Sequence, residues 1–123
     1  MITGAHTIIY SNNPPADRAF LRDVLKFPHV DAGEGWLIFS LPPAELAVHP
    51  SDQNDKQELF LICDDIEVFI LEMADHNITC TEIQNQRWGK ITYITLPGGG
   101  QLVDYQPAHA RPAAPDLSER NIK

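Results

Sequence analysis

The sequence predicts an α+β fold in which two βαβββ units form a curved mixed sheet around a cavity. Residues 5–50 and 58–107 each read as a strand, an amphipathic helix and three more short strands. The polar residues 51–57 between them contain no apolar side chain and are typical of a linker. Because one helix cannot bury a four-stranded sheet, the two units are expected to pair and to enclose a cavity.

The first unit begins with a β-branched run at residues 6–10, which ends at a turn rich in Ser, Asn and Pro. Residues 16–25 carry apolar side chains on one stripe, which predicts an amphipathic helix that stops before Pro28. Three short strands are expected to follow, at residues 30–35, 36–41 and 45–49. This order completes the first βαβββ unit.

The second unit repeats the order. A strand is expected at residues 58–63, and Asp64 is expected to cap the helix at residues 66–76, since Glu67 three positions later completes a near capping-box pattern. The remaining strands are expected at residues 78–83, 90–96 and 101–106. A glycine-rich hairpin turn at residues 97–100 joins the last two.

Aromatic residues occupy comparable places in the two units. Phe20 and Phe69 lie at matching positions on the two helices and are expected to be buried against the sheet. Trp36 and Trp88 each stand beside a glycine. Either they fill the core or a dimer interface, or they form a wall of the cavity.

Composition limits the classes of partner. The chain has 123 residues, 43% hydrophobic and 21% charged, which is typical of one globular domain. We assign this domain to residues 1–107 and expect residues 108–123, rich in Ala and Pro, to be an irregular tail. A net charge of -8 without a basic cluster argues against nucleic acid or an anionic membrane as partner.

The cellular location and the thiol chemistry follow from similar observations. No secretory signal pattern and no apolar run long enough to span a bilayer is seen, so a cytoplasmic location is expected. Cys63 and Cys80 lack the spacing of a disulfide framework or a zinc site. Both are expected to be free thiols.

Three segments carry a family resemblance. They are residues 16–25, the helix entry at residues 63–67 and residues 88–107, which include Pro97-Gly98-Gly99-Gly100 and Tyr105-Gln106-Pro107. In this order they resemble the vicinal oxygen chelate superfamily, which includes glyoxalase I, bleomycin and fosfomycin resistance proteins and extradiol dioxygenases. The resemblance implies a glyoxalase-like fold and a small-molecule ligand, and the internal repeat leads us to expect a homodimer.

The resemblance also implies a set of metal ligands. Enzymes of this superfamily hold one divalent metal ion with up to four side chains, and the matching positions here are His6, Glu45 and Glu58. Imidazole and carboxylate together suit Zn, Mn, Fe, Ni or Co. Counted without gaps, the fourth position falls on Val103, one residue before Asp104. Only a bulge or a register shift would turn Asp104 to the same face and make it a ligand.

These features predict a small-molecule-binding protein of the glyoxalase and bleomycin-resistance type. If a metal is bound, it would be a lyase or isomerase with Glu45 or Glu58 as general base. Glu58 stands where extradiol dioxygenases commonly have His, which makes that activity less favoured. The alternative is metal-free binding or sequestration of a drug or metabolite, which the missing fourth carboxylate favours. Singly, His6, Glu45 and Glu58 also fit ordinary solvated strand residues.

Overall fold

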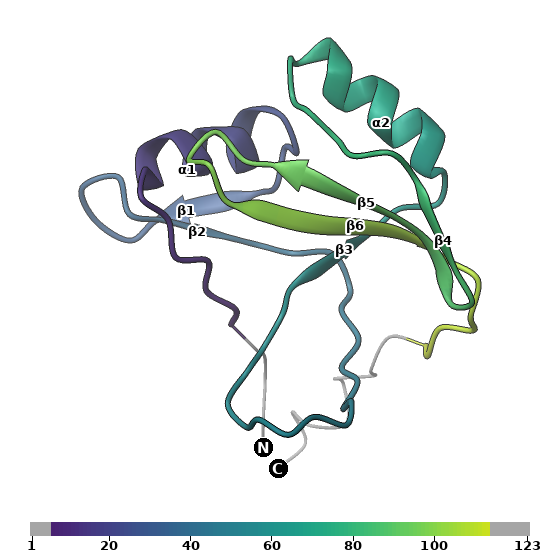
Figure 1. Cartoon of the computed structure of the whole chain (residues 1–123). Coiled ribbons are helices and arrows are strands. Elements are labelled where there is room, and N and C mark those ends of the chain that lie inside the picture. Colours follow the sequence, from purple (N-terminus) through teal and green to yellow (C-terminus); the bar gives the residue numbers. More distant parts are fainter. Residues whose placement is uncertain (1–5, 114–123) are drawn as a thin grey trace.

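The computed structural model describes residues 6–113 and has the predicted α+β architecture, with two helices and a mixed sheet (Figure 1). The elements are α1 (Pro14–Asp23), β1 (His29–Asp31), β2 (Leu37–Phe39), β3 (Phe60–Ile62), α2 (Ile66–Asp75), β4 (Gln84–Gln86), β5 (Gly89–Thr95) and β6 (Gln101–Pro107). The main sheet has the order β3-β6-β5-β4, in which only the β3–β6 pair is parallel. Strands β1 and β2 form a separate antiparallel pair.

Local sequence signals explain the best-defined elements of the second half. The β5–β6 hairpin closes with a hydrogen bond from the Leu96 N–H to the Gly100 carbonyl (2.8 Å), and Gly99 adopts a φ of 96°, which favours glycine. Helix α2 is capped by Asp65, whose carboxylate accepts a hydrogen bond from the Val68 N–H at 3.2 Å. The predicted cap at Asp64 is therefore wrong by one residue.

One hydrophobic core joins both helices to the sheet. It consists of Phe20 from α1, Met73 from α2 and Ile94, Leu96 and Leu102 from the β5–β6 hairpin region. Figure 1 shows both helices on the same side of the β3-β6-β5-β4 sheet. Phe20 is buried as predicted, whereas Phe69 is only partly buried at the edge of this cluster.

A buried carboxylate ties α1 to the β5–β6 turn. Asp17 is only 8% exposed, and it accepts hydrogen bonds from the Gly98 N–H at 2.7 Å and from the Ser11 hydroxyl at 2.6 Å. A Cβ atom on Gly98 would lie 2.6 Å from the Asp17 carboxylate, so a larger residue there would have to displace this carboxylate. This contact positions the first half of the chain against the second.

Three predicted strands are wrong in whole or in part. Residues 6–10 and 45–49 form no strand, and residues 78–83 contribute only an isolated bridge between Cys80 and Ile94. In the first two segments the β-branched and alternating patterns are present, but no strand within residues 6–113 supplies a hydrogen-bonded partner. A strand gains stability only when its backbone groups are paired.

Other sequence predictions concern the linker, the tail, the thiols and membrane association. Residues 51–57 have no regular structure and are exposed, and residues 108–113 are likewise irregular; the rest of the predicted tail lies outside the described residues. Cys63 and Cys80 are free thiols, as predicted. No helix within residues 6–113 combines the length and the apolar character needed to cross a membrane.

Candidate ligand-binding site

The two faces of the main sheet differ in character. On β6, Leu102 and Asp104 are buried on the side that the helices cover, while Val103 and Tyr105 alternate to the opposite side. Register places Phe60 of β3 beside Val103 on that opposite side. We call it the open face.

An aromatic cluster lies on the open face. The Tyr105 ring packs edge to face against Trp88, with centroids 5.1 Å apart, and against Phe60 at 5.9 Å. Phe60 and Trp88 are 6.2 Å apart. Gly89 permits this packing, because a Cβ atom there would lie 3.2 Å from the Tyr105 ring and would overlap the Gln106 carbonyl oxygen. We call Phe60, Trp88 and Tyr105 the aromatic cluster.

The aromatic cluster remains accessible. Phe60 is 36% exposed and Trp88 is 38% exposed, although each ring has two aromatic neighbours. Large aromatic rings that meet yet keep exposed surface offer a platform on which another flat apolar group can pack. The cluster is therefore the candidate site for an organic ligand.

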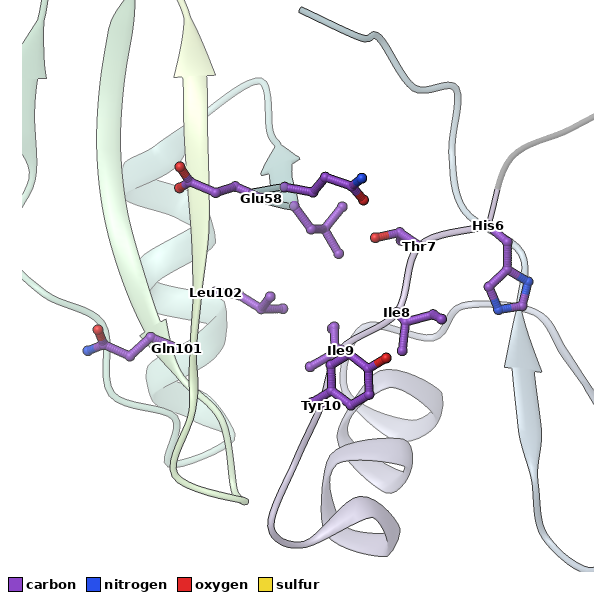
Figure 2. A pocket seen from close by; sticks show the side chains of 10 residues that line it. His6, Thr7, Ile8, Ile9, Tyr10, Glu58, Gln101 and Leu102 are labelled. Atoms are coloured by element: carbon purple, nitrogen blue, oxygen red, sulfur yellow. The ribbon is translucent and has the colours of Figure 1, made fainter. Parts of the chain in front are cut away.

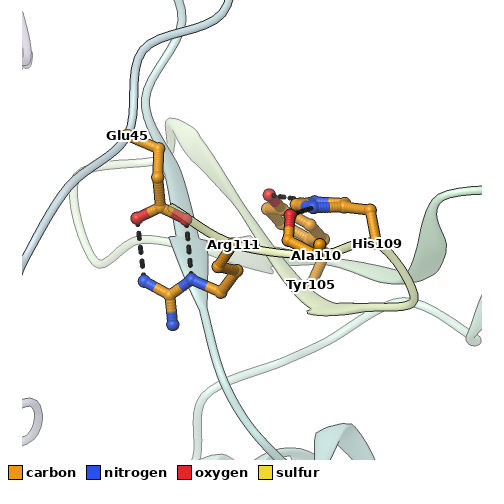
Figure 3. Close-up of polar contacts among 5 residues, drawn as sticks. All are labelled: Glu45, Tyr105, His109, Ala110 and Arg111. Atoms are coloured by element: carbon orange, nitrogen blue, oxygen red, sulfur yellow. Dashed lines mark hydrogen bonds and ion pairs between the residues drawn. The ribbon is translucent and has the colours of Figure 1, made fainter. Parts of the chain in front are cut away.

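Polar and charged groups lie at the edge of the cluster, in the irregular residues after β6. Arg111 donates two hydrogen bonds to Glu45, from Nε to Oε1 at 2.6 Å and from Nη2 to Oε2 at 2.8 Å (Figure 3). The Tyr105 hydroxyl lies 3.1 Å from Nε2 of His109, whose Nδ1 is 2.8 Å from the Ala110 carbonyl.

Electrostatics link these groups to the cluster. Burial raises the pKa of Tyr105, the Glu45 carboxylate raises it further, and Arg111 opposes the rise. The hydrogen bonds from Arg111 lower the pKa of Glu45, and desolvation opposes this shift in part. Both members of the ion pair therefore lie close enough to the Tyr105 hydroxyl to influence its ionisation.

Two depressions flank the main sheet. One of about 530 Å³ lies between Ile62 and Cys63 on one side and residues 106–111 on the other, with His109 and Arg111 in its wall. The second, of about 410 Å³, lies between residues 6–10 and the start of β3 and β6. Figure 2 shows the second one, where the His6 ring and the Glu58 carboxylate are directed away from each other.

The four predicted metal ligands do not converge in this arrangement. His6 and Glu58 line the smaller depression, and Glu58 is exposed with the Lys56 ammonium 3.8 Å away. Glu45 is paired with Arg111. Within residues 6–113 no three His, Cys, Asp or Glu side chains are grouped so that they could hold a metal ion. The donor set as placed here does not fit a divalent metal, so that site remains a prediction that would require Glu45 to leave Arg111.

Asp104 belongs to a different environment. The β5–β6 register runs without a bulge from Gly89 opposite Pro107 to Thr95 opposite Gln101, which leaves Asp104 on the helix-covered side. It is 1% exposed, and the Cys63 thiol donates a hydrogen bond to it at 2.9 Å. Asp104 is therefore on the wrong face of the sheet to join His6, Glu45 and Glu58.

Burial changes the acid–base chemistry of this interior group. Desolvation raises the pKa of Asp104 to about 6, and the hydrogen bond from Cys63 lowers it in part. Burial and the neighbouring Asp104 carboxylate together raise the pKa of Cys63 well above its ordinary value. Cys63 is consequently a protonated thiol and a poor nucleophile at neutral pH.

Sequence reasoning missed the polar edge of the site. Arg111 lies in a segment predicted to be an irregular tail, and its partner Glu45 is 66 positions earlier, so no local pattern connects them. The aromatic cluster was more accessible to prediction. Trp88 was one of two candidate wall residues, and the hairpin that pairs Gly89 with Pro107 brings Trp88 near Tyr105. The other candidate, Trp36, is exposed elsewhere, with the Arg18 guanidinium 4.9 Å from its ring centre.

Comparisons with known proteins bear on the fold. No protein-family model matches the chain, and no curated protein is significantly similar in sequence. Among solved structures, TnmS3, an antibiotic binding protein from Streptomyces sp. CB03234, matches with a TM-score of 0.62 and 16% identity, over 88% of this chain and 100% of its own. Lactoylglutathione lyase from Agrobacterium tumefaciens matches with a TM-score of 0.56 and 14% identity, over 85% of this chain and 92% of its own.

A third match names the superfamily. A member of the glyoxalase/bleomycin resistance protein/dioxygenase superfamily from Sphaerobacter thermophilus DSM 20745 has a TM-score of 0.58 and 23% identity, over 85% of this chain and 98% of its own. Identities of 14% to 23% establish the fold and leave the activity open. The chain therefore has the fold of the glyoxalase/bleomycin resistance protein/dioxygenase superfamily, as its sequence predicted.

Proposed function

We propose that this protein binds a small organic molecule by packing an aromatic part of the ligand against Phe60, Trp88 and Tyr105. The observation that carries the proposal is the meeting of three rings from separate chain segments within 5.1 to 6.2 Å on a face where Phe60 and Trp88 remain exposed. Apolar and aromatic walls with a few polar groups at the edge are typical of small-molecule sites.

The fold is compatible with both binding and catalysis. One structure with this fold is described as an antibiotic binding protein and another as a lactoylglutathione lyase. The placement of the acidic side chains favours binding, because Glu45 is paired with Arg111 and Asp104 lies on the opposite face from the cluster. We therefore prefer metal-free binding or sequestration to a metal-dependent lyase or isomerase. Elemental analysis of protein purified without chelator tests the choice, and a stoichiometric divalent metal would reverse it.

Ligand binding is testable through Trp88. In a Trp36→Phe background, Trp88 is the sole tryptophan and reports from within the cluster. Titration with bicyclic aromatic compounds should give saturable quenching, and Phe60→Ala should weaken binding about tenfold through the loss of one aromatic contact. The matched control is Leu71→Ala, since Leu71 is exposed on α2. Equal affinities for the two variants would contradict the proposal.

We also propose a homodimer. Several large apolar side chains in the first half of the chain are more than half exposed; they are Ile8, Tyr10, Val30, Trp36, Leu46 and Val48. Large apolar side chains exposed to water favour association with a second copy. Sedimentation equilibrium should give twice the mass of 13.8 kDa, and the double substitution Leu46→Asp and Val48→Asp should give the monomer mass. A monomeric parent protein would exclude the dimer.

Two further predictions about the setting of the protein remain proposals. We expect a cytoplasmic location, which fractionation of the producing cells tests. We also expect no nucleic-acid or membrane partner, because the net charge of -8 repels phosphate.

A further inference from the structure

We propose that Arg111 selects the ligand and that the ligand is an aromatic carboxylate, whose carboxyl group takes the place of Glu45 on Arg111. The inference rests on the proposed function, because it adds a charged group to the aromatic cluster at its polar edge. Glu45 is then an internal competitor for the ligand.

The Arg111–Glu45 contact has the geometry of carboxylate recognition. Nε and Nη2 of Arg111 contact the two carboxylate oxygens separately, at 2.6 and 2.8 Å. This two-point arrangement matches the planar guanidinium to any carboxylate, including that of a ligand. The site for a carboxyl group is therefore already formed, and a side chain of the protein occupies it.

Glu45 is suited to displacement. It lies in a segment without regular structure, and Leu46 beside it is 93% exposed. The Arg111 and Glu45 side chains are themselves accessible, at 42% and 20% of their surface. Ion pairs that are accessible to solvent contribute little to folding stability. Replacing Glu45 on Arg111 with the carboxylate of a ligand should therefore cost little free energy.

The carboxylate position and the aromatic cluster lie within reach of one ligand. Both Glu45 and Arg111 influence the pKa of Tyr105, and His109, two residues before Arg111, contacts the Tyr105 hydroxyl. Ile62, opposite Tyr105 in the β3–β6 register, lines the same depression of about 530 Å³ as Arg111. Phe60, Trp88 and Tyr105 do not line this depression themselves; Tyr105 lies next to it, because Ile62 and Gln106 in its wall are neighbours of Tyr105.

The negative charge of the protein does not prevent recognition of an anion. The field of the net charge of -8 is screened over about 8 Å at physiological ionic strength. Arg111 meets a carboxylate at 2.6 to 2.8 Å, which is well inside this screening length. Selectivity therefore depends on Arg111 and its competitor Glu45.

Matched probes test the inference. 2-Naphthoate and 2-naphthamide share the same ring system and differ in the charge of the group that would meet Arg111. Titration of the Trp36→Phe protein should show about two- to fivefold tighter binding of the naphthoate, as expected for an ion pair that remains accessible to solvent. Arg111→Gln should remove this preference, because naphthoate binding falls to the level of naphthamide binding. Glu45→Gln should strengthen naphthoate binding, because the internal carboxylate is lost.

The outcomes separate the two proposals. Suppose that both probes bind in a Phe60-dependent manner. If Arg111→Gln then weakens the binding of neither probe, or if Glu45→Gln weakens the binding of naphthoate, the carboxylate inference fails and the aromatic site stands. If neither probe binds the parent protein, the aromatic site and the inference both fail. Arg111→Lys keeps the charge without the two-point geometry and should retain only part of the naphthoate preference. Thermal unfolding of each variant checks that it is folded.

Discussion

The two halves of the molecule share a predicted order of elements but reach different degrees of structure. In the second half, β3, β5 and β6 pair into one sheet beneath α2. In the first half, α1 packs into the same core through Phe20, yet β1 and β2 pair only with each other and residues 6–10 and 45–49 form no strand. A helix satisfies its backbone internally and needs only an apolar stripe to dock, whereas a strand needs a neighbour.

The largest expected effect tests whether the first half depends on this shared core. Phe20→Ala should lower the free energy of unfolding by about 3 to 5 kcal/mol, because it leaves a cavity between α1 and the sheet. Phe69→Ala should cost about half as much, since Phe69 is only partly buried. Urea denaturation measures both, with Leu71→Ala as the exposed control. A larger loss for Phe69→Ala than for Phe20→Ala would mean that α2 is the better packed helix.

The buried Asp104 offers a test confined to the second half. Its pKa is raised to about 6 in the folded protein, so the folded state holds the proton more tightly than the unfolded state does. The contribution of Asp104 to the free energy of unfolding should therefore be fully present below about pH 4. It should fall by about 2 kcal/mol as the pH rises to about 6, a figure that is reduced for solvent screening of the carboxylate.

The matching variant is Asp104→Asn, which cannot ionise and should flatten the stability profile between pH 4 and pH 6. Urea midpoints at a series of pH values give the comparison. An identical pH dependence for the parent protein and for Asp104→Asn would show that another group is responsible.

A smaller effect is expected at the hydrogen bond between Asp17 of α1 and Gly98 of the β5–β6 turn, which links the two halves. Asp17→Ala leaves the Gly98 N–H without its acceptor and should cost about 1 to 2 kcal/mol. Asp17→Asn retains an oxygen that can accept this hydrogen bond and should cost less. Hydrogen exchange of the Gly98 amide gives an independent measurement. Unchanged protection of this amide in Asp17→Ala would contradict a stabilising hydrogen bond between the two residues.

The smallest effect is expected at the second link between the halves. Glu45 and Arg111 also join distant segments, but both side chains are accessible to solvent. Glu45→Gln and Arg111→Gln should therefore leave the thermal unfolding midpoint unchanged within experimental error. A clear destabilisation by either substitution would assign this ion pair a structural role and would weaken its proposed exchange with a ligand.

The sequence by itself determined the elements whose signals are local. The helices, the Gly-rich hairpin turn and the strands on either side of it depend on side chains within a few residues of one another. The alternation of side chains along a strand also predicts that Val103 and Asp104 lie on opposite faces of the sheet, and the regular strand β6 places them so. Even the misplaced cap of α2 is an error of one residue.

Only the tertiary structure decided which strands form and what the candidate site contains. The alternating patterns at residues 6–10 and 45–49 favour strands, but strand formation depends on a neighbouring backbone that a local pattern does not specify. The same applies to the site. Phe60, Trp88 and Tyr105 meet because β3 and β5 both pair with β6, and Arg111 reaches Glu45 across 66 positions. Such contacts depend on the path of the whole chain, so the pairing of distant segments determines them.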